Sequence, residues 1–364
     1  MFEANARIYL SPPYFGDAER HAVSAAFDTG YVAPTGPCID EFERNIAEVA
    51  RRKAAVAVSS GTAALDLILD ELGVDESWTV VAPTLTFIAT VGSAWHRGAS
   101  LVFVDCADDM NVDPELVEKA LRETAGKKLF IGVDLYGKCC DYGLLKQICD
   151  GTGTKFVMDS AEAFGSKRGE TTAGSGGFAA VFSFNGNKII TTSGGGAIVT
   201  DDVDAAFRMR KKSQQNRENL PWYEHNAVGY NYRMSNLLAA LGNAQIKRLE
   251  HIIARRRYNY EFYSRFFTMK KRDESDNAWL SIAILESAKE RDQVMVSLSS
   301  DNIESRPVWK PMHLQSVFRH CKTYGGKCAE EFFERGICLP SGTGMTPEDF
   351  ARIERAIHRA LAKQ

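Results

Sequence analysis

A lysine at the end of a predicted buried strand is the residue best placed for covalent chemistry. Lys188 closes the segment Ser183 to Lys188 (Ser-Phe-Asn-Gly-Asn-Lys), which follows the apolar run Ala179 to Phe182. The run predicts a buried strand and the Asn-Gly-Asn sequence predicts a tight loop, so little water should reach this amine. Desolvation favours a neutral amine, the nucleophilic form that a Schiff-base lysine needs. A surface loop lysine is the alternative, and Lys188 alone does not decide between them.

An aspartate and an aromatic residue follow two other predicted strands. Asp159 comes directly after the run Lys155 to Met158. A carboxylate buried at a strand end needs a cation, and a protonated pyridine nitrogen is one. Phe87 follows the run Thr79 to Ala82 and could lie flat against an aromatic ring. Taken singly, Asp159 could instead cap a loop and Phe87 could belong to the core.

A third strand end predicts a phosphate site. The segment Ser59 to Leu65 (Ser-Ser-Gly-Thr-Ala-Ala-Leu) opens a helix after the run Ala54 to Val58. Gly61 would allow close backbone approach, and the helix start, with help from the Thr62 hydroxyl, would bind a phosphate monoester. An ordinary serine N-cap is the alternative. A Gly-x-Gly-x-x-Gly fingerprint does not follow this strand, which disfavours an NAD-linked dehydrogenase.

Short apolar runs alternate with helix-length segments as far as about residue 200. Strands that are apolar throughout are typical of a mostly parallel sheet covered on both faces, so we predict an α/β fold. Ligands of such sheets gather at the carboxyl ends of the strands, where the candidate residues lie. The predicted strands are Ala54 to Val58, Thr79 to Ala82, Leu101 to Val104, Leu129 to Asp134, Lys155 to Met158, Ala179 to Phe184 and Ala197 to Thr200.

The rest of the sequence predicts a smaller second domain. A polar loop from Lys211 to Met234 precedes a long helix that should bridge from a large domain, residues 1–250, to a C-terminal α+β domain, residues 251–364. Apolar residues repeat on one face of that helix: Leu238, Leu241, Leu249 and Ile252. Further predicted elements are a strand at 279–284, a helix at 288–298 and a last helix after Thr346.

Composition favours a protein that acts on small metabolites. The 364 residues are 45% apolar and 25% charged, with a net charge of -3, which gives no field to gather nucleic acid or an anionic membrane. Residues 1–7 lack an apolar signal core, so a cytoplasmic location is expected. The cysteines have no Cys-x-x-Cys spacing, and neither a metal site nor a disulfide framework is expected.

A phosphate cradle, a flat aromatic, an acid and a sheltered lysine are the parts needed to hold pyridoxal phosphate as an electron sink. The sequence resembles the fold-type-I pyridoxal-phosphate aminotransferases of sugar-nucleotide biosynthesis, the DegT/DnrJ/StrS type, from Ile8 to Gly342. Its motifs Ser-Gly-Thr-Ala-Ala-Leu, Asp-x-Ala-Glu, Ser-Phe-Asn-Gly-Asn-Lys and Gly-Tyr-Asn-Tyr-Arg-Met occur in the family's order. The resemblance implies a large cofactor-binding domain, a smaller C-terminal domain and a homodimer with shared active sites.

The resemblance also implies a role for each matching residue. Lys188 would hold the cofactor covalently and move the proton, Asp159 would pair with the ring nitrogen, and Glu162 would neighbour the ring hydroxyl. The other implied roles are Gly61, Thr62 and Ser183 on the phosphate, Phe87 on the ring, Asn231 on the phosphate and Arg233 on the substrate in the partner subunit, and His313 on the sugar nucleotide. A capped or buried histidine is the alternative for His313.

The amino-acid sequences of the lysine loop and of residues Trp309 to His313 are most similar to those of one branch of the family. That branch aminates C4 of UDP-linked 2-acetamido-4-keto-6-deoxy sugars, as in the bacillosamine pathway of protein glycosylation, with L-glutamate as the usual donor. Many members have Gln or His at Glu162, and this departure bears on the substrate rather than on the reaction type. The alternatives are a 3-keto sugar nucleotide, a perosamine-type GDP sugar, an inosose, or a non-catalytic regulator of this fold.

Overall fold

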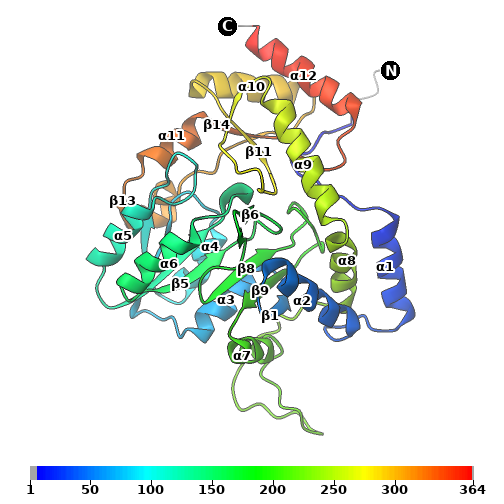
Figure 1. Cartoon of the computed structure of the whole chain (residues 1–364), viewed down its shortest axis with the longest axis vertical. Helices are drawn as coiled ribbons and strands as arrows, with labels where there is room; N and C mark the ends of the chain where they lie inside the picture. The colour runs from blue at the N-terminus through cyan, green and yellow to red at the C-terminus, as the bar shows by residue number, and fades with distance from the viewer. Residues whose placement is uncertain (1–5, 363–364) are drawn as a thin grey trace.

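The computed structural model describes residues 6–362 and is built around a central sheet (Figure 1). All neighbouring strands from β8 to β13 are parallel, whereas β9 is antiparallel to both β8 and β1. The predicted runs all form strands of this sheet. In spatial order the strands are β1 (Ala54–Val58), β9 (Gly196–Thr200), β8 (Ala179–Ser183), β5 (Lys155–Asp159), β4 (Lys127–Val133), β2 (Trp78–Pro83), β3 (Ser100–Val104) and β13 (Lys322–Tyr324).

Helices cover both faces of the sheet, as the apolar strands predict. In β1, Ala55 and Ala57 belong to one hydrophobic cluster, whereas Val56 and Val58 belong to another. The first cluster takes in residues of α2 (Pro37–Ala50), α5 (Pro114–Glu123) and α6 (Tyr142–Gly151). The second takes in residues of α3 (Gly61–Glu71), α4 (Ala89–His96) and α7 (Val203–Ser213). Successive strand residues face opposite sides, so each strand is apolar along its whole length.

A smaller antiparallel sheet lies above the central one in Figure 1. Its spatial order is β10 (Thr268–Met269), β11 (Ser281–Ile284), β14 (Gly336–Leu339) and β12 (Arg306–Pro307). The associated helices are α10 (Ala288–Ser300), α11 (Lys327–Arg335) and α12 (Pro347–Leu361). The remaining short elements are α1 (Asp17–Asp28), β6 (Lys167–Arg168), β7 (Thr171–Thr172), η1 (Leu135–Gly137), η2 (Met312–Leu314) and η3 (Ser316–Phe318).

The predicted single bridging helix is wrong, because the chain forms two helices, α8 (Asn236–Ile246) and α9 (Leu249–Tyr263). Contacts with Glu19 of α1 accompany the break: Gln245 Nε2 and Arg248 Nη1 each donate to its Oε1 at 2.7 Å. These bonds hold the junction against α1, and α9 leaves at a new angle toward the smaller sheet (Figure 1).

Two further boundaries differ from the predictions. The strand expected from residue 279 begins at Ser281, because Ala278 takes a left-handed φ of 51° just before it. Lys211, expected in the polar loop, lies within α7. The domain boundary after residue 250 stays a prediction, and β13, expected in the second domain, pairs with β3 of the central sheet.

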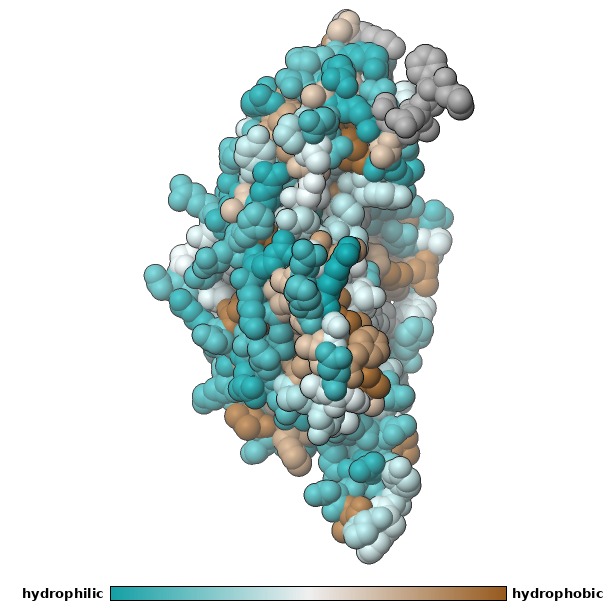
Figure 2. Space-filling view, turned by 90° about the vertical axis from the view of Figure 1, so that its right-hand side faces the viewer, coloured by the Kyte–Doolittle hydropathy of each residue, from teal (hydrophilic) through white to brown (hydrophobic). Residues whose placement is uncertain are grey.

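An extended arm, residues 215–229, projects beyond α7 (Figure 1) and forms the narrow lower end of the molecule in Figure 2. Tyr230 N donates to Lys212 O at 2.7 Å and closes its base. The arm exposes large apolar side chains, namely Leu220, Trp222, Tyr223 and Val228. Within residues 6–362, the helices are all too short or too polar to cross a bilayer.

Arg256 of α9 joins the N-terminal segment to the segments next to β11 and β14 of the smaller sheet from a buried position. Its side chain donates to Ser11 Oγ at 3.0 Å, to Trp279 O at 3.2 Å and to Thr343 Oγ1 at 3.1 Å, and also to the Ser341 carbonyl. The residue is 1% exposed, and in the described part of the chain none of these partners is a carboxylate. In this part of the chain its charge is therefore balanced by dipoles that converge from three segments, around residues 11, 279 and 341–343.

We expect Arg256→Met to lower the free energy of unfolding by about 3 kcal/mol, since it leaves several buried acceptors unpaired. Urea unfolding followed by circular dichroism measures the change. Arg44→Met, an exposed position of α2, is the matched control and should change stability by less than about 0.5 kcal/mol. Equal effects of the two variants would show that the buried hydrogen bonds do not stabilise the fold.

Candidate active site

Lys188 lies just beyond the end of β8, and its amine is sheltered. Its Nζ is 3.3 Å from Glu162 Oε1 and 4.2 Å from the centroid of the Trp279 ring. The Lys188 side chain is 13% exposed and that of Glu162 is 5% exposed. A lysine free in a surface loop does not have these contacts, so the alternative of a solvated lysine is wrong.

The loop that carries Lys188 is held from two distant segments. The carbonyl oxygen of Asn187 accepts from Ser11 Oγ at 2.7 Å and from Trp279 Nε1 at 2.6 Å. Trp279 therefore contacts both the backbone and the amine of this loop. Sequence reasoning missed Ser11 and Trp279, because they approach from the N-terminal segment and from the segment just before β11 of the smaller sheet.

Asp159 ends β5, where the sequence predicts it, and is 7% exposed. Thr90 Oγ1 donates to its Oδ2 at 2.8 Å, and the amide of Ala161 donates to its Oδ1 at 3.2 Å. Burial raises the pKa of Asp159, and the hydrogen bond from Thr90, the amide and the charge of Lys188 oppose that rise. This carboxylate would gain strongly from a cation that enters the site.

Glu162 connects the lysine to the loop after β4. The amide of Tyr136 donates to its Oε2 at 2.7 Å, while its Oε1 faces Lys188. Burial raises the pKa of Glu162, and the positive charge of Lys188 opposes that rise more than any other group. Both carboxylate oxygens are thus fixed, one by a backbone amide and one by the lysine.

The start of α3 has the shape of a phosphate cradle. Ser60 caps the helix, since its hydroxyl accepts from Ala63 N at 3.0 Å. A Cβ at Gly61 would lie 3.2 Å from Ser183 Cβ, so the glycine permits close contact between two strand ends. In the part of the chain that the structure describes, the amides of Gly61 and Thr62 donate to no acceptor. Free amides at a helix start bind phosphate, so the predicted residues fit this group.

Four aromatic rings, of Phe87, Tyr136, Trp279 and Trp309, form a cluster near the lysine. Trp309 lies 5.5 Å from Phe87 and 5.1 Å from Tyr136 between ring centroids, and Tyr136 lies 6.3 Å from Trp279. Phe87 is 55% exposed, so one face of its ring is open to a flat ligand. The alternative that Phe87 belongs to the core is wrong.

Neither predicted substrate residue contacts the lysine of its own chain, and the role of Arg233 in the partner subunit stays a prediction. Arg233 is buried, pairs with Glu43 and donates to Ala57 O at 3.0 Å, so it could reach a substrate only by leaving a buried ion pair. His313 Nδ1 lies 2.6 Å from Thr84 Oγ1, and its Nε2 lies 3.0 Å from Glu330 Oε1. Both ring nitrogens are occupied, which favours the capped histidine.

Asn231, predicted to reach the phosphate of a partner subunit, is exposed at the base of the arm, where it forms a bridge with Gln214. Its predicted role stays a prediction.

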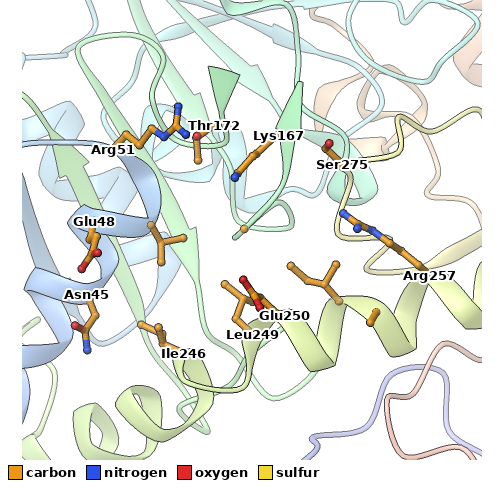
Figure 3. Close-up of a pocket in the computed structure, with 14 residues that line it drawn as sticks. Asn45, Glu48, Arg51, Lys167, Thr172, Ile246, Leu249, Glu250, Arg257 and Ser275 are labelled. Carbon is orange, nitrogen blue, oxygen red and sulfur yellow. The ribbon is translucent and has the colours of Figure 1, made fainter. Parts of the chain in front are cut away.

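Two cavities of the structure lie at different distances in the fold from the lysine loop. A cavity of about 820 Å³ is lined by α2, α9 and the β6 region, and Figure 3 shows Lys167 and Glu250 pointing into it. It includes none of the predicted site residues. A second cavity, of about 420 Å³, is lined by Asn187, Trp279 and Arg306. The second cavity adjoins the lysine loop and is the better place for a substrate.

Residues 13–358 match the model of the DegT/DnrJ/EryC1/StrS aminotransferase family. The chain belongs to this family. It is 37% identical to EpsN of Bacillus subtilis, named as a pyridoxal phosphate-dependent aminotransferase, over 95% of this chain and 94% of that protein. It is 34% identical to the GDP-perosamine synthase of Caulobacter vibrioides over 98% of each chain.

A solved structure supports the same assignment. The PLP form of Spr1654 from Streptococcus pneumoniae, named as a sugar aminotransferase, superposes with a TM-score of 0.90. The sequences are 27% identical, with 98% of this chain and 99% of that one covered. This member of the family is therefore a sugar aminotransferase that uses pyridoxal phosphate, and the amine of Lys188, the Asp159 carboxylate and the α3 start fit that cofactor.

The raised pKa of Asp159 predicts how stability depends on pH in the cofactor-free protein. The folded state holds the proton more tightly than the unfolded state, so this contribution is full below the ordinary carboxyl pKa and is lost as the pH rises through the raised pKa. We therefore expect the stability of the natural protein, relative to Asp159→Asn, to fall as the pH rises above the ordinary carboxyl pKa of about 4 and through the raised pKa of Asp159.

Urea midpoints of both proteins across this range measure the trend. The exposed Asp40→Asn is the control and should follow the natural protein at every pH. A constant difference between the natural protein and Asp159→Asn would mean that folding does not perturb this carboxyl.

Proposed function

We propose that this sugar aminotransferase moves the amino group of L-glutamate to C4 of a UDP-linked 2-acetamido-4-keto-6-deoxy hexose. The sheltered amine of Lys188, 3.3 Å from Glu162 at the carboxyl end of the sheet, is the observation that carries the aminotransferase reaction. The choice of sugar is supported by the amino-acid sequences of the lysine loop and of residues Trp309 to His313. Trp309 belongs to the aromatic cluster, so one residue of the second of these segments lies beside Phe87.

Each group of the chain has a separate task in this proposal. Lys188 would hold the cofactor through its amine, and the same amine would move a proton at the reacting carbon. Asp159 would pair with the protonated ring nitrogen, and the hydrogen bond from Thr90 fixes the orientation of the Asp159 carboxylate. The start of α3 binds the phosphate. Pyridoxal phosphate supplies the electron sink that stabilises negative charge on the substrate carbon.

The relatives favour a second candidate, a GDP-linked sugar of the perosamine type. The identity of 34% to a GDP-perosamine synthase extends over nearly the whole chain. The two candidates differ in the nucleotide and in the group at C2 of the sugar, while the amine transfer is the same. Arg306 and Trp279 line the cavity beside the lysine loop and are the residues expected to contact the sugar nucleotide.

We also propose that two copies form a dimer and complete each other's sites. The arm exposes Trp222, Tyr223 and Val228, and Asn231 lies exposed at its base. A second copy would cover these apolar side chains and could bring Asn231 toward the phosphate cradle of its partner.

Replacing Lys188 by alanine should remove the visible absorbance of the bound cofactor and lower turnover by at least about 1000-fold, because the group that binds the cofactor and moves the proton is lost. Lys167→Ala, an exposed lysine of β6, should leave both unchanged. Undiminished turnover in Lys188→Ala would refute the assignment.

A panel of keto sugar nucleotides decides between the candidates. We expect the purified protein, with glutamate, to convert the UDP-linked 2-acetamido-4-keto-6-deoxy sugar with kcat/KM at least about tenfold above the GDP-linked keto sugar, which corresponds to about 1.4 kcal/mol. Product mass and NMR identify the aminated carbon. The reverse order would favour the perosamine-type reaction, and no conversion of either would overturn both substrates.

A further inference from the structure

A second lysine, Lys270, is buried behind the active site. It follows β10, its amide donates to Ile282 O at 2.8 Å, and the residue is 6% exposed. Its Nζ donates to the carbonyl oxygen of Leu135 at 3.1 Å. Lys270 therefore reaches from the smaller sheet into the loop that follows β4 of the central sheet.

The carbonyl that Lys270 contacts belongs to the same peptide group as the amide that binds Glu162. Leu135 O accepts from Lys270, and Tyr136 N donates to Glu162 Oε2 at 2.7 Å. A peptide group is planar, so fixing its oxygen fixes the direction of its N–H. A cation at the oxygen also polarises the group and strengthens the bond that its N–H donates.

The Leu135–Tyr136 peptide needs hydrogen bonds from outside the turn to stabilise it, because the turn is strained. Tyr136 has a φ of 52° and Gly137 a φ of 91°, both in the left-handed region. That conformation costs about 1–2 kcal/mol for a residue with a side chain. The bond from Leu135 N to Asn111 Oδ1, 3.2 Å, and the bond from Lys270 hold the turn on its outer side.

We infer that Lys270 is a positioning residue, which holds Glu162 against Lys188 through the Leu135–Tyr136 peptide. The connection is continuous: Lys270 Nζ to Leu135 O, Tyr136 N to Glu162 Oε2, and Glu162 Oε1 to Lys188 Nζ at 3.3 Å. The active amine thus depends on where the smaller sheet places Lys270. The inference rests on the proposed function only in taking Lys188 as the amine that holds the cofactor.

Other charges face these groups and define the competing explanation. Lys270 faces Asp276, Lys138, Asp109 and Glu162, and burial lowers its pKa while Asp276 raises it. Lys138 Nζ itself pairs with Asp109 Oδ2 at 3.1 Å. Besides Lys270, the ionisable groups that face Glu162 are Lys188 and Asp159, with the Tyr136 phenol and the Cys338 thiol nearby. Lys270 could therefore serve only to neutralise Asp276 and stabilise the fold.

The two explanations predict opposite changes in Lys270→Met. If Lys270 positions Glu162, the carboxylate moves away from Lys188, and a positive charge at that amine is less stabilised. If Lys270 acts only through its own charge, its removal makes a positive charge at Lys188 easier to hold. We expect the pH midpoint of the bound cofactor's visible absorbance to fall by about half a unit, which corresponds to about threefold in proton affinity.

A second measurement does not need the cofactor. In the cofactor-free protein, we expect Lys270→Met to raise the rate at which acetic anhydride modifies Lys188, followed by peptide mass spectrometry, by about threefold. Lys271→Met, an exposed neighbour, is the matched control and should leave the rate unchanged. Lys270→Gln, which keeps an N–H for Leu135 O, should restore most of the natural rate and serves if the methionine variant does not fold.

A double-mutant cycle isolates the route through Glu162. In a Glu162→Gln background, Lys270→Met should no longer change the modification rate, because the carboxylate that it positions is gone. The same change in both backgrounds, a slower modification, or a raised midpoint would overturn the inference. Failure of the proposed function looks different. The cofactor's absorbance band would then survive Lys188→Ala, while Lys270→Met would still change the modification rate of Lys188 in the cofactor-free protein.

Discussion

The amine of Lys188 and the carboxylate of Glu162 lie 3.3 Å apart with little access to water, and the surrounding structure is arranged to keep them there. Removing such a pair from solvent is expensive unless every remaining lone pair and proton is satisfied. Glu162 meets this condition through the amide of Tyr136, and the amine of Lys188 through the face of the Trp279 ring. Positive charge on this amine is stabilised by the Trp279 ring in addition to the Glu162 carboxylate.

The central sheet alone does not produce this arrangement. Its parallel strands bring Asp159 and the segment after Ser183 to one edge, where a phosphate cradle also forms at the start of α3. The smaller sheet and the N-terminal segment then close over that edge, since Trp279 and Ser11 both bond to the carbonyl of Asn187. Arg256 joins these same segments through buried hydrogen bonds. The stability of the fold and the position of the active amine therefore share the same contacts.

The sequence predicts the parts of this design that depend on local pattern. Apolar runs identified the strands, and the sequences of the loops that follow them identified Lys188 and Asp159 at the strand ends. Contacts made by residues far apart in the chain were not predictable in this way. Thr90 bonds to Asp159 from a helix that follows a different strand, and Lys270 comes from another sheet.

The errors have the same physical origin. The break between α8 and α9 accompanies bonds to Glu19, which lies more than 200 residues earlier. The guanidinium of Arg233 is likewise buried against Glu43, which precedes it by 190 residues, and its contact with a substrate in the partner subunit stays a prediction. A local motif places the backbone of Arg233, and only the packed fold decides where its charge is neutralised.

Covalent trapping of the cofactor tests the central claim most directly. The protein loaded with pyridoxal phosphate would be reduced with sodium borohydride, digested and mapped by mass spectrometry, since reduction fixes the cofactor to the amine that holds it. We predict one phosphopyridoxyl group per chain, on the peptide that contains Lys188. A group on Lys270, on Lys138 or on an exposed lysine, with Lys188 unmodified, would contradict the account.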